Sequence, residues 1–170
     1  MKRIKGQVLN EALIAMGIVT VGILGMVGFL SKAISEGRYI ADQTTAVNLA
    51  AEGVEIAKNI LDGNAVAGGV AWNNGLETEG FYEVDYTSQS LGGVVSASEN
   101  ESALRFLRKA QAGNAEFYKY NEGGETGFKR SVEIDYIASH QIRATSRVYW
   151  RARGGLLRNI SLSSDFYYWR

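Results

Sequence analysis

The N-terminal part of the chain contains an unbroken run of apolar residues. Residues 12–30 have no charged side chain, and Thr20 is the only polar one among these 19 residues. At about 1.5 Å per helical residue, the run nearly matches the hydrocarbon core of a bilayer, which is about 30 Å thick. It is also longer than the apolar stretch of a secretory signal peptide. The pattern therefore predicts one membrane-spanning helix.

A helical pattern continues over residues 31–62, where one apolar stripe runs between charged positions. The stripe recurs every seven residues and is widened by three further positions: Ile40, Val47, Val54 and Leu61, then Leu49, Ile56 and Ile60. Asp62, Gly63 and Asn64 then form a helix stop signal. A continuous helix over residues 8–61 would be roughly 80 Å long, which is more than a domain of this size needs. We therefore expect half of the helix to lie outside the globular part.

Residues 63–170 have the pattern of a β-rich head. The chain contains 20 glycines and no proline, so its turns depend on glycine and asparagine. Strands are expected over residues 81–87, 128–138, 141–152 and 156–168. A short helix is expected over residues 99–112, with Leu104, Phe106 and Leu107 as its apolar positions and Gly113-Asn114 at its end.

The strand over residues 141–152 alternates between two faces. Its apolar face comprises Ile142, Ala144, Val148 and Trp150, and its polar face comprises Arg143, Thr145, Arg147 and Arg151. Gly154 and Gly155 are expected to join this strand to the last one as a hairpin. Antiparallel strands packed on a long helix form an α+β fold.

Composition excludes several kinds of chemistry. Cysteine is absent, and His140 in a predicted turn is the only histidine, so neither thiolate metal sites nor histidine pairs can form. The carboxylates Glu83, Asp85, Glu133 and Asp135 alternate along strands, which is typical of a solvent-exposed face. No glycine-rich stretch is followed by the Gly-Lys-Ser/Thr of a phosphate loop. We expect neither an enzyme nor a bound cofactor or metal.

The charge distribution predicts the orientation of the span. Lys2, Arg3 and Lys5 precede the apolar run, and basic residues beside a first helix stay on the cytoplasmic side. The bulk of the chain is then extracytoplasmic. Formal net charge is zero over the whole chain, so overall charge favours no nucleic-acid partner.

The residues between the basic cluster and the apolar run are Gly6 and then Gln7-Val8-Leu9-Asn10-Glu11-Ala12-Leu13. This segment resembles the leader of a type IV prepilin. The resemblance implies that a prepilin peptidase removes residues 1–6 by cutting after Gly6, and that the new N-terminal residue, Gln7, is methylated. Glu11 is then fifth in the mature chain, as in the family. The family usually has phenylalanine or methionine first, where this chain has Gln7.

The resemblance covers the first 60 or so residues specifically and the remainder only in architecture. It implies a minor pilin or pseudopilin, a structural subunit that polymerises through a helix over residues 7–30. The implied partners are other pilin subunits, the prepilin peptidase, an inner-membrane assembly platform and membrane lipid. The subunit is implied to span the cytoplasmic membrane once before assembly and to lie in an extracytoplasmic or cell-surface filament afterwards.

Three features near the helix have two interpretations each. In pilins, the glutamate corresponding to Glu11 pairs with the N-terminal amine of a neighbouring subunit, but near a helix N-terminus it also complements the helix dipole. Gly22, Gly25 and Gly28 either loosen the helix or permit close approach of other helices. The stretch over residues 48–56 resembles minor pilins found near filament tips, and it also fits an ordinary amphipathic helix.

A cluster of arginines and aromatic residues near the C-terminus is the remaining candidate site. Arg143, Arg147 and Arg151 with Trp150 form a candidate surface patch for DNA or a surface polymer, since basic residues among aromatics bind such chains. The same residue types are also common on strands for structural reasons. The alternative function for the whole chain is a single-pass, membrane-anchored binding or sensor module that does not polymerise.

Overall fold

The computed structural model describes residues 5–88, 90–91, 95, 99–113, 115–152 and 154–168. The chain forms two compact units, an N-terminal unit over Met1–Ala41 and a C-terminal unit over Asp42–Arg170. One long helix, α1 (Lys5–Ala67), contributes to both units. Residues 1–4 of the expected leader lie outside the described part of the chain.

In the N-terminal unit, every described side chain from Gln7 to Ile34 is exposed. Large apolar residues are included, such as Phe29, which is 76% exposed. Within the described residues, α1 is the one helix that is long and apolar enough to cross a membrane. The chain therefore carries a helix whose apolar surface is covered by no other part of its own unit.

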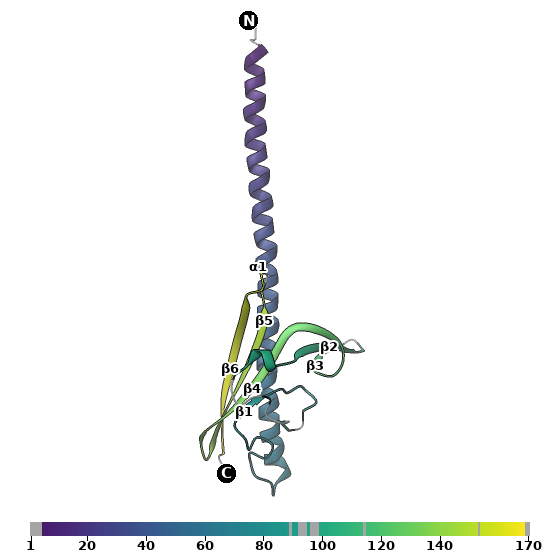
Figure 1. The fold of residues 1–170 in the computed structure, drawn as a ribbon, viewed down its shortest axis with the longest axis vertical. Helices are drawn as coiled ribbons and strands as arrows, with labels where there is room; N and C mark the ends of the chain where they lie inside the picture. The colour runs from purple at the N-terminus through teal and green to yellow at the C-terminus, as the bar shows by residue number, and fades with distance from the viewer. Residues whose placement is uncertain are drawn as a thin grey trace. The chain divides into compact units, whose positions relative to one another are not determined.

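The C-terminal unit contains a six-stranded antiparallel sheet in the order β3-β2-β4-β5-β6, with β1 paired to β4 (Figure 1). Its strands are β1 (Gly80–Tyr82), β2 (Phe106–Ala112), β3 (Ala115–Lys119), β4 (Gly124–Ala138), β5 (Gln141–Arg151) and β6 (Leu157–Tyr167). The three long strands form a meander, as the sequence predicts. The expected α+β fold, a long helix on an antiparallel sheet, is confirmed.

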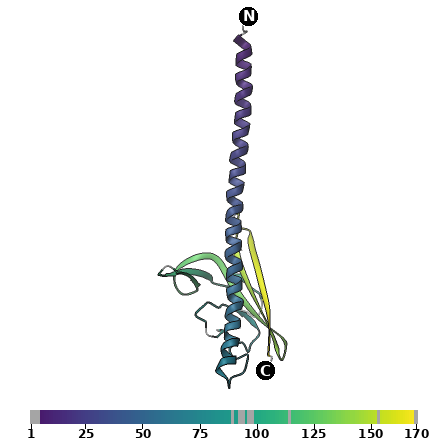
Figure 2. The ribbon, with the colours of Figure 1, turned by 180° about the vertical axis from the view of Figure 1, so that it is seen from behind.

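One face of the sheet packs against α1, which crosses in front of the strands when the molecule is seen from behind (Figure 2). The core consists of two clusters along the helix. The first joins Ile56 and Ile60 to Val132, Ile134 and other residues of β4 and β5. The second gathers Ala46, Leu49, Ala50, Leu107, Tyr120, Val148 and Trp150. The apolar face predicted for β5 is therefore buried against the helix.

The helix face that meets the sheet overlaps the predicted stripe in part, because Leu49, Ile56 and Ile60 are buried as the stripe predicts. Ile40 is 60% exposed and Val47 is 41% exposed, whereas Leu61 of the same stripe is buried. The buried face in the C-terminal unit instead includes several small residues: Ala46, Leu49, Ala50, Gly53, Ile56, Ala57, Ile60 and Leu61. Small residues allow the helix backbone to lie close to the sheet, so residue size rather than apolarity alone selects the face.

The helix expected over residues 99–112 is wrong. This segment holds one short 3-10 turn, η1 (Glu101–Ala103), and then β2, which pairs with both β3 and β4. Gly113, with φ of 63°, directly follows β2, whose last residue, Ala112, pairs with Ala115 of β3, so it does not end a helix. The spacing of Leu104 and Leu107 suggests a helix turn, but Leu104 ends η1 and Leu107 lies in β2, where pairing with β4 determines the structure.

Two predicted boundaries also change. The strand expected over residues 81–87 ends at Tyr82, because Asp85 bonds the backbone and hydroxyl of Thr87 and holds a turn instead. Helix α1 continues past the predicted stop to Ala67, where Gly68 adopts φ of 64°. The side chain of Asn64 donates to the carbonyls of the loop that follows the helix.

The contact between Gly53 and Ser146 generates the first prediction. A Cβ atom added at Gly53 would collide with the side-chain oxygen of Ser146 on β5. We expect Gly53→Ala to lower the free energy of unfolding by about 1–3 kcal/mol. Gly63→Ala is the matched control, because a Cβ there meets nothing within 4 Å and alanine favours a helix by up to about 1 kcal/mol. Equal unfolding midpoints for both variants in chemical denaturation would contradict this packing.

Candidate functional site

Glu11 is the only charged residue from Gln7 to Leu30. It lies on α1 with its side chain exposed, and the amide of Gln7 donates to its carboxylate at 3.3 Å. Thr20, the polar residue inside the apolar run, bonds the carbonyl of Met16 at 2.7 Å and so needs no outside partner. Since a carboxylate is costly in hydrocarbon, Glu11 requires a polar partner if this segment is surrounded by lipid or other apolar helices.

The structure brings the residues of the predicted N-terminal site together on one helix. Gly6, Gln7 and Glu11 all lie within α1, and the last two are one helical turn apart. A Cβ atom added at Gly22, Gly25 or Gly28 meets nothing within 4 Å. These glycines therefore leave small, open areas on the helix, unlike Gly53, which is packed against the sheet.

Inside the C-terminal unit, a fully buried arginine fastens the helix to the sheet. Arg130 on β4 is 0% exposed. Its guanidinium donates to the carbonyl of Leu49 on α1 (3.0 Å) and to the carbonyl of Val84 after β1, and lies 3.3 Å from the Glu52 carboxylate. Residues 48–56 thus supply both apolar packing and an ion pair to the sheet. These contacts give a structural explanation for the sequence of that segment.

The groups beside Arg130 have shifted pKa values. Burial raises the pKa of the Tyr120 phenol, whose hydroxyl donates to the Arg130 carbonyl at 3.1 Å. Burial also favours the neutral form of Asp85, but hydrogen bonds from Thr87 and Tyr120, with the Arg130 charge nearby, outweigh it and hold the pKa of Asp85 below its usual value. Asp85 is therefore a buried structural anion. The sequence pattern instead predicts a solvent-exposed strand face.

The predicted arginine patch is divided by the structure. Trp150 is 5% exposed and packs on the helix side of the sheet. Arg143, Arg147 and Arg151 point to the opposite side, where Arg143 is bonded to Asp165 by two hydrogen bonds (2.7 and 3.0 Å). Arg147 pairs with Glu99 at 2.7 Å, whereas Arg151 donates to the carbonyl of Gly155. The aromatic member and two of the three arginines are thus not available as one surface.

The outer sheet face is partly covered. Tyr149 is 4% exposed and donates to Glu99, and its burial together with that bond raises its pKa to about 12. Burial and the neighbouring Asp135 raise the pKa of Glu133. His140 is exposed in its turn, as predicted. No group of three or more metal-ligating side chains lies among the described residues.

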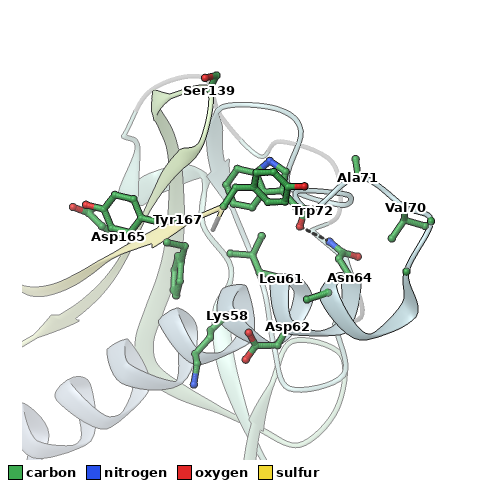
Figure 3. A pocket seen from close by; sticks show the side chains of 15 residues that line it. Lys58, Leu61, Asp62, Asn64, Val70, Ala71, Trp72, Ser139, Asp165 and Tyr167 are labelled. Carbon is green, nitrogen blue, oxygen red and sulfur yellow. Dashed lines mark hydrogen bonds between the residues drawn. The ribbon is translucent and has the colours of Figure 1, made fainter. Parts of the chain in front are cut away.

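Sequence reasoning missed an open groove of about 710 Å³ at the C-terminal end of α1 (Figure 3). The rings of Trp72 and Tyr168 stack there with centroids 5.6 Å apart. Asn64 donates to the carbonyl of Trp72 at 3.0 Å, and Lys58 and Asp62 line the helix side. The groove joins segments about 100 residues apart, so no local sequence signal identifies it.

Comparisons of the chain with protein-family models, with curated proteins and with solved structures found no match.

The buried guanidinium generates the second prediction. Arg130→Met is expected to lower the free energy of unfolding by about 3 kcal/mol, because it leaves buried carbonyls without a donor and Glu52 without its cation. The control is Arg108→Met, because Arg108 lies 3.8 Å from Glu125 and both side chains are exposed, a pair worth at most about 1 kcal/mol. Denaturant titrations of both variants measure the difference, and similar losses would overturn the role given to Arg130.

Proposed function

We propose that this protein is a structural subunit, a minor pilin or pseudopilin, of a type IV pilus-like filament. The observation that carries the proposal is the exposed apolar helix of the N-terminal unit with Glu11 at its beginning. A helix that is apolar all round is stable only when surrounded by lipid or by other apolar surfaces. In a filament, copies of the same helix supply that surface after the helix leaves the membrane.

Two further features support polymerisation over simple anchoring. A permanent anchor does not need a carboxylate at the edge of its apolar run, whereas a subunit that pairs Glu11 with the amine of its neighbour does. The open areas at Gly22, Gly25 and Gly28 suit close packing of helices, which in an apolar environment depends on small residues. The α+β arrangement of the C-terminal unit is compatible with this role.

The proposed mechanism has three stages. The helix is first stored in the cytoplasmic membrane with its N-terminus inside. A prepilin peptidase then cuts after Gly6, and Gln7 becomes the methylated N-terminus. An assembly machine finally extracts the subunit into a filament outside the membrane, where Glu11 sets its register against the next subunit. The protein is a substrate of this chemistry and carries out none itself.

Processing after Gly6 gives the third prediction. The intact mass of the protein from its native membrane is expected to correspond to a chain that begins at Gln7 and carries one added methyl group. Gly6→Val is expected to leave the chain uncut, and Gly17→Val is the matched control, because it changes a glycine of the same helix with open space around it. An uncut chain in the unaltered protein, or a cut beyond Leu30, would overturn the filament proposal.

Glu11 gives the fourth prediction, which separates assembly from processing. Glu11→Gln is expected to be cut after Gly6 normally but to enter filaments at least tenfold less, since loss of an ion pair in a low-dielectric environment costs more than about 1.4 kcal/mol. Thr20→Val is the control, because Thr20 bonds only its own helix. The measurement is the fraction of subunit in sheared filaments, and equal fractions for both variants would refute the assembly role of Glu11.

A second candidate is the anchored binding module, and the groove at Trp72 is the observation that favours it. A concave site lined by aromatic and polar side chains is the usual form of a small-ligand site. A membrane-retained chain that starts at Met1 and never enters a filament would select this candidate over the first.

A further inference from the structure

The hairpin that joins β5 to β6 presents two arginines and two leucines to solvent. Its turn is made by Gly154 and Gly155, with φ of 91° and 80°. Leu156 is 56% exposed and Leu157 is 40% exposed. Arg151 and Arg158 flank them and are both exposed. These four residues, Arg151, Leu156, Leu157 and Arg158, are called the hairpin tip below.

The tip holds a positive charge that the protein does not neutralise. In the described part of the C-terminal unit, eight of the eleven arginines and lysines have a carboxylate within 4.0 Å. The three without one are Lys58, Arg151 and Arg158. The sequence also has no aspartate or glutamate from residue 136 to residue 164. Two of the three unpaired cations therefore lie at the same end of the sheet, on opposite faces, because Arg158 pairs with Trp150 and Arg151 pairs with Leu157.

The tip lies at the end of the C-terminal unit where α1 enters it. Trp150, next to Arg151, packs in the same cluster as Ala46 and Leu49, whereas residues at the start of β5 pack in the cluster of Ile56 and Ile60. Only 11 residues separate Leu30, the last of the apolar run, from Asp42. Even fully extended, such a segment spans roughly 40 Å, so the C-terminal unit remains near any membrane that the apolar run crosses.

The combination of unpaired arginine and exposed leucine fits a particular kind of surface. Basic residues are attracted to anionic lipid headgroups by about 1 kcal/mol each, and neighbouring leucines insert into the boundary below them. Single-stranded nucleic acid, in contrast, is held by exposed aromatic rings. The aromatic residues nearest the tip, Tyr149 and Trp150, are 4% and 5% exposed. The chemistry of the tip therefore favours an anionic bilayer surface over nucleic acid.

We propose that the hairpin tip docks on the anionic lipid headgroups of the membrane that α1 crosses, and so holds the C-terminal unit against the bilayer. Arg151 and Arg158 bind phosphate groups of the lipid, and Leu156 and Leu157 enter the interface. The inference rests on the membrane span of the proposed function but not on polymerisation. Docking limits the orientations that the C-terminal unit adopts at the bilayer.

The fifth prediction uses the absence of cysteine, which permits a single fluorescent label. The full chain carrying Asn159→Cys, close to the tip, is labelled and reconstituted into vesicles that contain nitroxide-headgroup lipid. Ser139→Cys, in the turn at the other end of β5, is the matched control position. With phosphatidylglycerol in the vesicles we expect quenching at residue 159 and little at residue 139. With phosphatidylcholine alone, or in about 1 M salt, where charges are screened beyond about 3 Å, we expect quenching at residue 159 to be lost.

Substitutions at the tip test the residues themselves. Arg151→Gln and Arg158→Gln are each expected to lower the docked-to-free ratio about fivefold, which corresponds to about 1 kcal/mol per charge. Arg108→Gln, at an exposed arginine with an acidic neighbour, is expected to change nothing. Flotation of the protein with the vesicles reports the membrane span separately, so a failure of docking is distinguishable from a failure of insertion.

Three results would overturn the inference. One is equal quenching at residues 159 and 139 in floated, anionic vesicles. Another is quenching that Arg151→Gln and Arg158→Gln together leave unchanged. The third is binding of a labelled oligonucleotide at the tip, lost in these two variants, without any lipid quenching, which would assign the tip to nucleic acid.

Discussion

The buried guanidinium of Arg130 joins parts of the C-terminal unit that are far apart in the sequence. The guanidinium donates to the carbonyl of Leu49 on α1 and to the carbonyl of Val84 after β1. The backbone carbonyl of Arg130 accepts a hydrogen bond from the Tyr120 hydroxyl. An arginine removed from water needs several hydrogen bonds to offset its lost hydration. These hydrogen bonds form together only when the helix, the loop at Val84 and the sheet hold one arrangement. The position of the helix on the sheet is therefore fixed by polar contacts as well as by apolar packing.

Helix α1 meets two different demands along its length. In the C-terminal unit, its contact face is rich in alanine and glycine, because the sheet approaches closely and Ser146 lies against Gly53. In the N-terminal unit, large apolar residues are exposed on every side, and glycines occupy open positions. The contact face in the C-terminal unit is thus covered by the sheet of the same chain. The apolar surface in the N-terminal unit requires an apolar environment from outside the chain. This difference underlies both the candidate membrane span and the proposed assembly.

Local patterns predicted what depends on local structure. Alternation within β4 and β5 and the glycines between β5 and β6 predicted the meander correctly, because each strand pairs with its neighbour in sequence. The prediction for residues 99–112 is wrong because two leucines three residues apart suggest a helix turn, whereas Leu104 ends η1 and only Leu107 lies in β2, which pairs with the distant β4. The contact face of α1 is predicted in part: Leu49, Ile56 and Ile60 are buried, but the apolar stripe does not reveal that small residues such as Ala46 and Gly53 let the sheet approach.

The candidate sites also differ in how far local sequence predicts them. The segment from Gly6 to Glu11 is a linear pattern, so the sequence alone suggests it as a candidate site, and the structure adds the exposure of the helix from Gln7 onward. The arginine patch depends on partners that the sequence does not place, and Asp165 and Glu99 neutralise two of its members. Arg130, its partners and the groove at Trp72 join segments tens of residues apart, so no local pattern contained them.

In the proposed arrangement, a weak docking contact is sufficient at the hairpin tip because the membrane span already holds the chain. Two arginines worth about 1 kcal/mol each would not bind a free protein to a membrane. A tether changes this, because it turns docking into an intramolecular event at a high effective concentration. In the proposed filament assembly, the same weakness is an advantage, because contacts of this size add only a small amount to the work of extracting a subunit. A tip that bound the membrane more tightly, for example through exposed aromatic side chains where Trp150 is buried, would hold the C-terminal unit on the bilayer and oppose its entry into a filament.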